Sequence, residues 1–470
     1  MRLGRSQRLG CAGILYDGRG FLLFGTQTIN EQGHLCIGGM DTKDLAKEFG
    51  TPLYIYDTAL IKQKISEFKQ AFNQHEGLKW QIAYASKAFS TVAMIQLIDQ
   101  QGLSLDVVSG GELYTALKAG MNPERIHFHG NNKSESELAM ALDAKIGAVI
   151  VDNFYELKLL EKMCAERNQE IAILLRVTPG VEAHTHEFIM TGQDDSKFGF
   201  NLDNGMADEA VKRSLRSPHL NLKGIHSHIG SQIFETDGFA GAIRIMMKHV
   251  DTWARDFAFQ LDVLNVGGGF GIHYTEGDNP LPIERYIDTI VDTTEEECTR
   301  YNLTMPEVWI EPGRSVVGEA GTTLYTVGSS KKIPGIRNYL SVDGGMSDNI
   351  RPSLYQAQYK AICANKALEP ADSQVALAGK CCESGDVLIK EADLPESCSA
   401  GDLVAVFSTG AYGYSMASHY NRITNPAVVF VENGEASLVV RRETYEDLIR
   451  QDMALNNLSR NSSQYENAKN

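Results

Sequence analysis

The sequence contains no uninterrupted apolar run near the roughly 18 residues that a membrane-spanning helix requires. Its eight cysteines include no C-x-x-C pair, the spacing common in zinc sites, and in a chain of 470 residues they are expected to be reduced thiols. Arg2, Arg5 and Arg8 stand near the N-terminus, but Asp17 and Arg19 interrupt the apolar residues that follow, so we predict no signal peptide. These absences predict a cytoplasmic protein without a membrane segment.

Positive charge is also scarce, because 44 lysines and arginines face 60 aspartates and glutamates, for a net charge of −16. This balance argues against nucleic acid as a partner, although local arginines can still bind an anionic small molecule. Apolar residues make up 43% of the chain and charged residues 22%. A chain of this length and composition can bury the cores of two domains.

Eight short apolar runs alternate with amphipathic, helix-like stretches, and polar residues follow nearly all of them. The runs are Ile82–Ala85, Leu103–Val108, Ile126–Phe128, Ala148–Val151, Ile171–Val177, Leu222–Ile225, Val263–Val266 and Val308–Ile310. Eight strand–helix units over roughly 240 residues predict an α/β fold, a TIM-type (β/α)8 barrel placed at residues 61–320. A doubly wound sheet has the same periodicity, but we prefer the barrel because barrel enzymes carry their chemistry on the loops after the strands.

The pattern changes after about Gly321. Strand-like runs succeed one another there: Thr323–Val327, Tyr339–Val342, Val375–Ala378, Leu403–Val406, Ala427–Val431 and Ala436–Val440. They predict an all-β domain at residues 321–450, completed by N-terminal strands within residues 34–60. In the same N-terminal part, Asp41 is expected to cap a helix at Thr42–Phe49 that Gly50 ends. Residues 1–33 are read as an extension and residues 451–470 as a polar tail.

Lys87 follows directly after the first apolar run of the predicted barrel. A lone lysine at such a place is usually a solvated loop cation. The alternative is an amine at the barrel mouth that is desolvated enough to form a Schiff base with a cofactor. The motifs after the other strands favour this second interpretation.

Gly267-Gly268-Gly269-Phe270-Gly271 follows the seventh run, and Glu311-Pro312-Gly313-Arg314 follows the eighth. Successive glycines allow backbone amides to approach an anion, and the loops after strands seven and eight form the common phosphate site of barrels. A carboxylate such as Glu311 can keep a pyridine nitrogen protonated, and Arg314 offers a forked donor to a phosphate or carboxylate. A tight turn and an internal salt bridge are the alternatives.

His226-Ser227-His228-Ile229-Gly230-Ser231 follows the sixth run. The two histidines share one face of an extended strand and could begin a zinc site, but this segment supplies no third ligand. We therefore expect no metal. His228 is expected to stack on a flat cofactor, and Ser231 to donate to its phosphate.

Three segments of the predicted β domain combine polar or aromatic side chains with glycine or proline. They are Arg351-Pro352-Ser353-Leu354-Tyr355, Cys382-Glu383-Ser384-Gly385-Asp386 and Gly410-Ala411-Tyr412-Gly413-Tyr414. A cysteine is most often a buried structural thiol. The polar loop around Cys382 makes an accessible, reactive thiol more plausible.

Together these motifs resemble the fold-type III pyridoxal-phosphate decarboxylases. The resemblance rests on Tyr84–Ala88, Asp106–Leu113, His226–Gln232, Glu311–Arg314, Cys382–Asp386 and Gly410–Tyr414, and it covers residues 35 to 450 in matching order. The segments Arg176–Gly180 and Gly192–Gly199 resemble the branch of this family that acts on meso-diaminopimelate. Phe89 stands where asparagine is frequent in the family, and residues 1–30 have no counterpart.

The resemblance implies a role for each matched position. Lys87 would carry pyridoxal 5'-phosphate as a Schiff base, His228 would stack on its ring and Glu311 would bind the pyridine nitrogen. The remaining cofactor-binding residues would be Ser231, Gly267, Gly268, Gly269, Gly313, Arg314 and Tyr412. The residues that would bind the substrate are Arg314, Arg351, Tyr355, Glu383 and Tyr412. Cys382 would be the general acid, contributed by the second subunit of a homodimer.

Other functions share parts of this set. A decarboxylase of ornithine, arginine or carboxynorspermidine would also use Lys87, Glu311 and Cys382, but arginines able to bind a second carboxylate favour a diacid. An enzyme resembling alanine racemase would place an arginine against the ring nitrogen, where this sequence has Glu311. A catalytically inactive, decarboxylase-like regulator is a third alternative, and the presence of both Lys87 and Cys382 argues against it.

Overall fold

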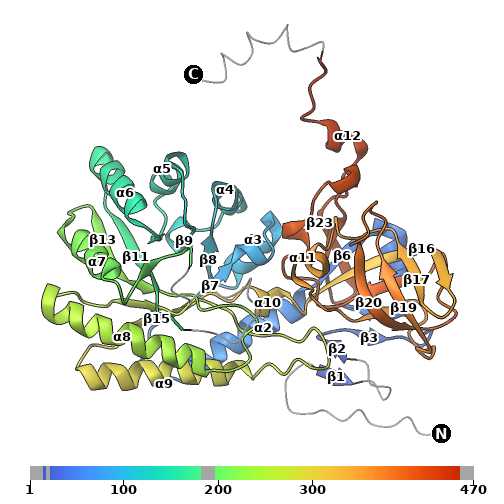
Figure 1. The fold of residues 1–470 in the computed structure, drawn as a ribbon, viewed down its shortest axis with the longest axis horizontal. Helices are drawn as coiled ribbons and strands as arrows, with labels where there is room; N and C mark the ends of the chain where they lie inside the picture. Colours follow the sequence, from blue (N-terminus) through green and yellow to red (C-terminus); the bar gives the residue numbers. More distant parts are fainter. Residues whose placement is uncertain (1–13, 17–21, 182–195, 456–470) are drawn as a thin grey trace.

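The computed structural model describes residues 14–16, 22–181 and 196–455. Two bodies lie side by side in it: a ring of parallel strands surrounded by helices, and a mostly β-sheet body to its right in Figure 1. The strands of the second body come from both ends of the chain, so the polypeptide enters it, leaves to build the ring, and returns.

The ring is a closed barrel of eight parallel strands. They are β7 (Trp80–Ala85), β8 (Ser104–Val107), β9 (Ile126–Phe128), β10 (Ala148–Val151), β11 (Ile171–Thr178), β13 (Leu220–His226), β14 (Val263–Asn265) and β15 (Glu307–Ile310). The last strand pairs with the first, at Val308 and Trp80, and β10 pairs with β11, so the sheet closes on itself. The predicted barrel is confirmed, and closure excludes the doubly wound sheet. A short strand, β12 (Phe200–Asn201), adds to β11 outside the ring.

Capping side chains start the helices that follow the first four strands. Thr91, Ser109, Ser134 and Asn153 each accept a hydrogen bond from a backbone amide of the first turn. The barrel helices are α2 (Thr58–Asn73), α3 (Val92–Gln100), α4 (Gly110–Ala119), α5 (Glu135–Ala144), α6 (Phe154–Arg167), α7 (Met206–Arg216), α8 (Asp237–Phe257) and α9 (Ile283–Tyr301). Because each of these four caps follows a strand closely, the helix N-termini gather at the end of the barrel where the strands finish.

The interior of the barrel changes from apolar to polar along its axis. One cluster of buried residues consists of Ala148, Ile150, Leu174, Val263 and Trp309. Side chains of a strand alternate in direction, so the residues two positions further along also point inward. They are Asp152, Arg176, Asn265 and Glu311. The sequence thus places a layer of polar and charged groups on an apolar floor, at the end of the barrel where the strands finish.

The second body confirms the predicted all-β domain with N-terminal strands. The strand β6 (Leu53–Asp57) pairs antiparallel with β16 (Gly321–Ile333) and parallel with β22 (Ala427–Glu432). Its other strands are β17 (Arg337–Val342), β18 (Ala361–Cys363), β19 (Ser373–Ala378), β20 (Val387–Leu394), β21 (Leu403–Val406) and β23 (Glu435–Val440). The sequence did not predict β18 or β20.

The N-terminal part builds small sheets before the barrel begins. A hairpin of β1 (Ile14–Tyr16) and β2 (Leu22–Phe24) precedes three antiparallel strands, β3 (Thr28–Ile29), β4 (Leu35–Ile37) and β5 (Met40–Asp41). The helix α1 (Thr42–Phe49) follows, capped by the Asp41 side chain and ended by Gly50, as predicted.

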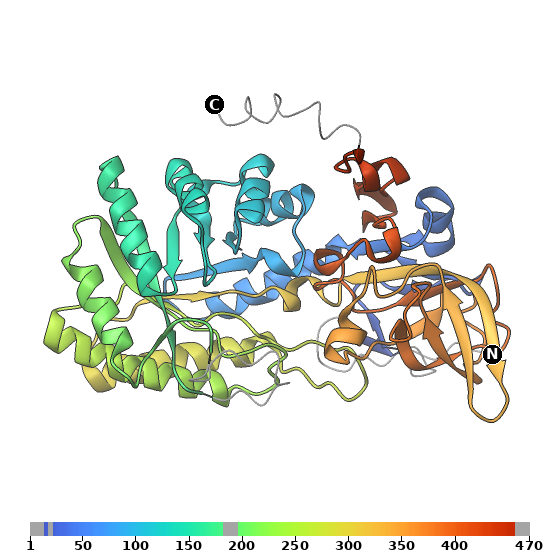
Figure 2. The same ribbon diagram turned by 45° about the horizontal axis from the view of Figure 1, so that its top comes forward.

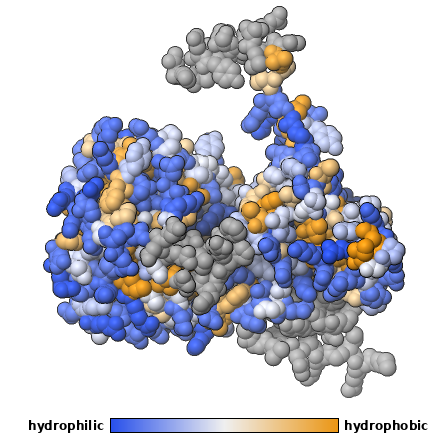
Figure 3. Space-filling view, viewed as in Figure 1, coloured by the Kyte–Doolittle hydropathy of each residue, from blue (hydrophilic) through white to orange (hydrophobic). Residues whose placement is uncertain are grey.

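At the other end of the chain, α12 (Tyr445–Ile449) projects away from the β domain, which Figure 2 shows from a second direction. The arm that it begins carries exposed apolar side chains: Tyr445, Ile449, Met453 and Leu455. The face seen in Figure 3 is otherwise mostly hydrophilic, with hydrophobic residues in small separate patches. Among the described helices, none is long and apolar enough to cross a membrane.

Candidate active site

Lys87 lies in a single 3-10 turn, Ser86–Ala88, directly after β7. The turn is tied to the next strand of the barrel by Glu112, whose carboxylate accepts hydrogen bonds from the Ser86 hydroxyl and the Val108 amide, each at 2.7 Å. These bonds anchor Ser86, directly before the lysine, to the end of the neighbouring strand, whereas the Lys87 side chain itself is accessible and lines a cavity at the barrel mouth.

The cavity, called here the lysine cavity, brings together most of the cofactor residues predicted from sequence. Those that line it are Lys87, His228, Ser231, Gly269, Glu311, Gly313, Arg314 and Tyr412. They come from loops after four different strands of the barrel and from the β domain. Asp106, Ala85, Phe270 and Ser315 complete the lining.

The three glycines after β14 do not play equivalent parts. A side chain on Gly268 would place its Cβ 2.1 Å from the carbonyl oxygen of Glu311, so only glycine allows the two loops to pack. The amides of Gly267 and Gly268 donate within the protein, to Asn265 Oδ1 at 2.9 Å and to His228 Nδ1 at 3.2 Å. Gly269, with a φ of +107°, is the one that lines the cavity.

Glu311 is buried at the end of β15 and is surrounded by donors. Asn265 Nδ2 lies 2.7 Å and His129 Nε2 3.0 Å from its Oε1, and His226 Nε2 lies 3.2 Å from its Oε2. Burial alone would raise the pKa of Glu311, but the two histidines outweigh burial and hold that pKa well below its usual range. The group is therefore an ionised carboxylate facing the lysine cavity.

Asp106, from β8, behaves in the opposite way. It lies 3.6 Å from the same Nε2 of His129, and burial raises its pKa to about 7; His129 opposes this effect and the nearby Glu311 adds to it. Two carboxyl groups that share one histidine therefore differ in proton affinity, and at neutral pH only Glu311 is firmly ionised.

The ring of His228 is held in a neutral form. Burial, reinforced by the positive charge of Lys87, keeps its pKa well below the usual range. The Gly268 amide donates to its Nδ1, so the proton of the neutral ring is on Nε2. A neutral imidazole in this position suits stacking on an aromatic ring.

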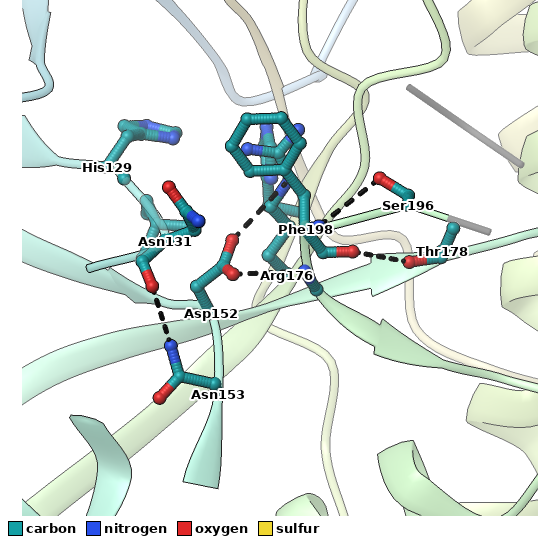
Figure 4. Close-up of polar contacts among 12 residues, drawn as sticks. His129, Asn131, Asp152, Asn153, Arg176, Thr178, Ser196 and Phe198 are labelled. Carbon is teal, nitrogen blue, oxygen red and sulfur yellow. Dashed lines mark hydrogen bonds and ion pairs between the residues drawn. The ribbon is translucent and has the colours of Figure 1, made fainter. Parts of the chain in front are cut away.

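Arg176 brings a further positive charge to the layer, and Figure 4 shows how it is held. The guanidinium lies over the ring of Phe198 at 4.1 Å from its centroid, and Asp152 Oδ1 is 3.9 Å from Nε. Asp152 also accepts the amide of Gly199 at 3.1 Å, while the Thr178 hydroxyl donates to the Phe198 carbonyl. Of the two segments that resemble the diaminopimelate branch, the first four residues of the second, 192–195, lie outside the described part of the chain.

A second cavity adjoins the first, since Arg314 lines both. It also contains Arg351 and Tyr355, from the helix α11 (Arg351–Tyr355). The Tyr412 ring lies between the two arginines, 4.9 Å from Arg314 Cζ and 5.1 Å from Arg351 Cζ. Burial would raise the pKa of Tyr412, but Arg314, Lys87 and Arg351 lower it, which marks a positive region suited to anions.

Arg314 is oriented by two hydroxyl groups. Its Nη2 donates to Ser231 Oγ at 2.9 Å and its Nη1 to the Tyr274 hydroxyl at 2.5 Å. Ser231 therefore serves as an acceptor for Arg314, a partner that sequence analysis did not foresee. Arg314 and Ser231 together form one donor site on the wall of the lysine cavity.

Cys382 and Glu383 lie elsewhere, on an exposed loop of the β domain. The Cys382 amide donates to Asn421 Oδ1 at 2.7 Å, and the Ser353 hydroxyl of α11 donates to the Gly385 carbonyl at 2.8 Å. Neither residue is among those that line the two cavities within the described chain. One chain thus collects the lysine, the carboxylate and the arginines, while the Cys382 thiol faces outward.

Sequence analysis missed His129 and Asn265 and assigned no role to His226, Asp106 or Arg176. The signal that could have found them is their spacing: each is the second of two inward positions on its strand. These side chains fit pyridoxal phosphate: an amine, a neutral imidazole, an ionised carboxylate and an arginine–serine pair converge on one cavity. The neighbouring glycines leave no room for a Cβ, which allows the loops to pack closely.

Comparison with known proteins agrees with this fit. Residues 58–318 match the family model described as pyridoxal-dependent decarboxylase, pyridoxal binding domain. The chain is 61% identical over 431 residues to diaminopimelate decarboxylase of Bacillus subtilis, which covers 92% of this chain and 98% of the relative. It is 48% identical over 427 residues to the Staphylococcus aureus enzyme of the same name, covering 91% and 99%. A solved diaminopimelate decarboxylase from M. jannaschii, in complex with L-lysine, superimposes with a TM-score of 0.86 at 34% identity and covers 92% of this chain and 99% of that one.

Proposed function

The chain belongs to the pyridoxal-dependent decarboxylases, within them to the diaminopimelate decarboxylases, and from this premise we propose how its residues act. The reaction is the decarboxylation of meso-2,6-diaminopimelate to L-lysine and carbon dioxide, the last step of lysine biosynthesis. The observation that carries the proposal is the convergence of Lys87, Glu311 and Arg314 on one cavity with a second, arginine-lined cavity beside it.

Lys87 would hold the cofactor covalently through its amine. Arg314, Ser231 and the glycine loop would hold its phosphate and His228 would stack on its ring, while Gly313 allows close packing against Ala85 and Ala88. When bound, pyridoxal phosphate supplies the electron sink that receives the electron pair left behind by carbon dioxide. Glu311 supports that sink because an ionised carboxylate keeps a neighbouring pyridine nitrogen protonated.

Arg351 and Tyr355 are proposed to bind the carboxylate at the far end of the substrate, with Arg314 and Tyr412 at the junction of the two cavities. Arg351 is well placed because its Nε donates to the Tyr359 hydroxyl at 3.0 Å, which fixes the plane of the guanidinium. A buried arginine favours a diacid over ornithine or arginine, whose far ends carry cations. This distinguishes the proposed substrate from the other basic amino acids.

Cys382 is proposed to donate the proton that replaces the lost carboxylate at Cα, and Glu383 to bind the distal ammonium. Because both lie on an exposed loop outside the cavities of their own chain, they would act in the site of a second chain. A two-fold symmetric homodimer makes both sites equivalent. The exposed apolar side chains of the C-terminal arm, Tyr445, Ile449, Met453 and Leu455, support such an association.

A cytoplasmic location is part of the same proposal. The seven described cysteines are all free, which is typical of proteins in a reducing compartment. The substrate is a small metabolite, and the net charge of −16 argues against nucleic acid as a partner.

Covalent trapping tests the cofactor site. Borohydride reduction of the enzyme loaded with pyridoxal phosphate should leave one stable adduct, and peptide mass spectrometry should locate it at Lys87. Lys87→Ala should abolish the adduct and turnover, whereas Lys69→Ala, which removes a lysine on the outer helix α2, should leave both in place. An adduct on another lysine in the wild-type protein would contradict the proposed site.

A further inference from the structure

The carboxylate of Glu311 contacts several protein side chains in addition to facing the lysine cavity. Three side chains from three strands reach it: Asn265 at the end of β14, His226 at the end of β13 and His129 just beyond β9. His129 and His226 are 4% and 1% exposed, so neither contact with Glu311 competes with bulk water.

The three donors are divided between the two carboxylate oxygens. Oε1 accepts a hydrogen bond from Asn265 at 2.7 Å and lies 3.0 Å from His129 Nε2, whereas Oε2 accepts a hydrogen bond from His226 at 3.2 Å. An ionised carboxylate offers about four acceptor positions. Hydrogen bonds from Asn265 and His226 occupy one position on each oxygen, and His129 lies close to the second position of Oε1; this leaves one position on Oε2, while Glu311 lines the lysine cavity.

This arrangement matters because a buried carboxylate and a pyridine nitrogen compete for one proton. Burial by itself favours the protonated, neutral acid. If the proton moved to Glu311, the ring nitrogen would lose its charge and the electron sink would weaken. Donors that are already in place make the carboxylate a poorer base and leave the proton on the nitrogen.

We propose that His129 and His226 are positioning residues: the hydrogen bond from His226 Nε2 to Oε2 and the close approach of His129 Nε2 to Oε1 keep Glu311 ionised and facing the lysine cavity. This inference rests on the proposed function. It adds to that function two residues that do not line the lysine cavity and act only through Glu311.

Charged groups on the neighbouring elements bear on the same carboxylate. Arg176 from β11 favours its ionised form, whereas Asp106 from β8 opposes that form only when Asp106 itself is ionised. His129 Nε2 lies 3.6 Å from Asp106 Oδ1 and 3.0 Å from Glu311 Oε1, so one imidazole faces both acids. The raised pKa of Asp106 reduces the repulsion between the two acids at neutral pH.

A metal ion is the competing explanation for two histidines and a carboxylate. The ligand atoms of His129, His226 and Glu311 all lie within 4.8 Å of one another. The separations of 3.0 and 3.2 Å between imidazole nitrogen and carboxylate oxygen are hydrogen-bond lengths, however, and Asn265 fills a further position with a donor that cannot bind a cation through its NH2 group.

The test compares leucine and glutamine at both positions, because glutamine can donate from nearly the place of the histidine Nε2 and leucine cannot. The variants are His129→Leu, His226→Leu and their double, with His129→Gln and His226→Gln as conservative partners. His127→Leu is the matched control: His127 is also buried in β9, but it stacks on Trp309 at 4.4 Å, in the apolar layer.

Two readouts do not depend on turnover. Infrared difference spectra of apoprotein labelled with 13C-glutamate report whether Glu311 is ionised, with Glu311→Gln as the reference. The 15N chemical shift of labelled pyridoxal phosphate reports protonation of its ring nitrogen in the holoenzyme. The wild type, both glutamine variants and His127→Leu should show an ionised Glu311 and a protonated nitrogen. The double leucine variant should show a protonated Glu311, and kcat should fall about 10- to 100-fold while KM changes little, the loss typical of removing groups that orient a catalytic residue.

The outcomes separate this inference from the function on which it rests. A wild-type protein that binds no pyridoxal phosphate or releases no carbon dioxide from diaminopimelate would overturn the function. A wild-type enzyme that is active, with folded leucine variants that keep Glu311 ionised and kcat unchanged, would overturn only the positioning role. So would a stoichiometric metal ion in the purified apoprotein. If the double variant does not fold, the same spectra are compared for the single variants His226→Leu and His226→Gln, and the proposal then requires that only His226→Leu shifts Glu311 toward its protonated form.

Discussion

The side chain of Asn265 joins the glycine loop to Glu311: its Oδ1 accepts the Gly267 amide at 2.9 Å and its Nδ2 donates to Glu311 Oε1 at 2.7 Å. The two bonds fix which end of the Asn265 amide faces which partner. They also connect two proposed parts of the cofactor site: the glycine loop, which would hold the phosphate, and the carboxylate, which would meet the ring nitrogen.

Glu311→Gln should slow decarboxylation by about two to three powers of ten while leaving cofactor affinity largely intact, because it removes one preorganised electrostatic partner. The glutamine amide cannot keep the ring nitrogen protonated, but it fills the same volume. Single-turnover kinetics and a cofactor titration measure the two effects separately. Unchanged turnover would mean that Glu311 does not act on the ring.

Arg351→Ala should raise KM for diaminopimelate far more than it changes cofactor binding, since its side chain lines the second cavity and the lysine cavity is lined by other residues. Truncating one partner of a buried, charge-assisted pair costs roughly 2–5 kcal/mol. Arg337→Ala is the control: Arg337 also lies near a tyrosine ring, 6.0 Å from that of Tyr339, but is itself exposed at the start of β17. Loss of cofactor affinity with an unmoved KM would refute the assignment.

Lys87→Ala and Cys382→Ala proteins should each be nearly inactive alone, yet recover activity when mixed and allowed to exchange subunits. Random association gives heterodimers with one intact site, and up to about a quarter of wild-type activity per subunit.

The control for this experiment mixes Lys87→Ala with Glu311→Gln. Both residues come from the same cavity, so every site in that heterodimer lacks one of them and activity should not return. If the first mixture restores nothing although mass spectrometry shows exchange, Lys87 and Cys382 act within one chain.

The stability of the β domain should depend on pH through Asp348. This residue is 2% exposed, accepts the Gly345 amide at 2.7 Å and receives the Tyr325 hydroxyl, and burial raises its pKa to about 7. The folded protein therefore retains a proton that the unfolded chain releases near pH 4, so this contribution is present below pH 4 and is lost as the pH rises through 7.

Asp348→Asn cannot ionise, so the stability of the wild type relative to this variant should fall by up to about 4 kcal/mol between pH 4 and pH 8. Urea unfolding of both proteins across this range measures the difference. Asp203→Asn, at an exposed position, controls for the loss of a carboxylate. A difference that stays constant with pH would show that Asp348 titrates alike in both states.

Much of the barrel could be predicted because parallel strands buried on both faces appear as continuous apolar runs, such as Ala148–Val151, whose predicted and observed bounds coincide. The strand β20 was missed because Lys390, Glu391 and Asp393 interrupt its apolar residues. The three-residue β18 was missed because it stands outside the regular strand–helix alternation that marked the equally short β9.

The site was predicted where motifs are local and missed where it depends on closure of the barrel. Lys87, Glu311 and Arg314 stand in short, distinctive segments. His226 and Glu311, by contrast, are 85 residues apart, and Asn265 and Glu311 are 46 apart, so their contacts exist only once the strands are neighbours. Nor can one sequence test the proposal that the exposed Cys382 loop and the Lys87 cavity belong to a shared site, because such a site would be a property of two chains.

Release of carbon dioxide from meso-diaminopimelate, ornithine and arginine, measured side by side on the purified protein with added pyridoxal phosphate, tests the central claim most directly. We predict rapid release from meso-diaminopimelate with stoichiometric L-lysine, release from the other two slower by at least about a hundredfold, as expected when a buried charge partner is left unpaired, and none from the Lys87→Ala variant. Equal or faster release from ornithine or arginine, or no release from meso-diaminopimelate by a protein that binds the cofactor, would contradict the account.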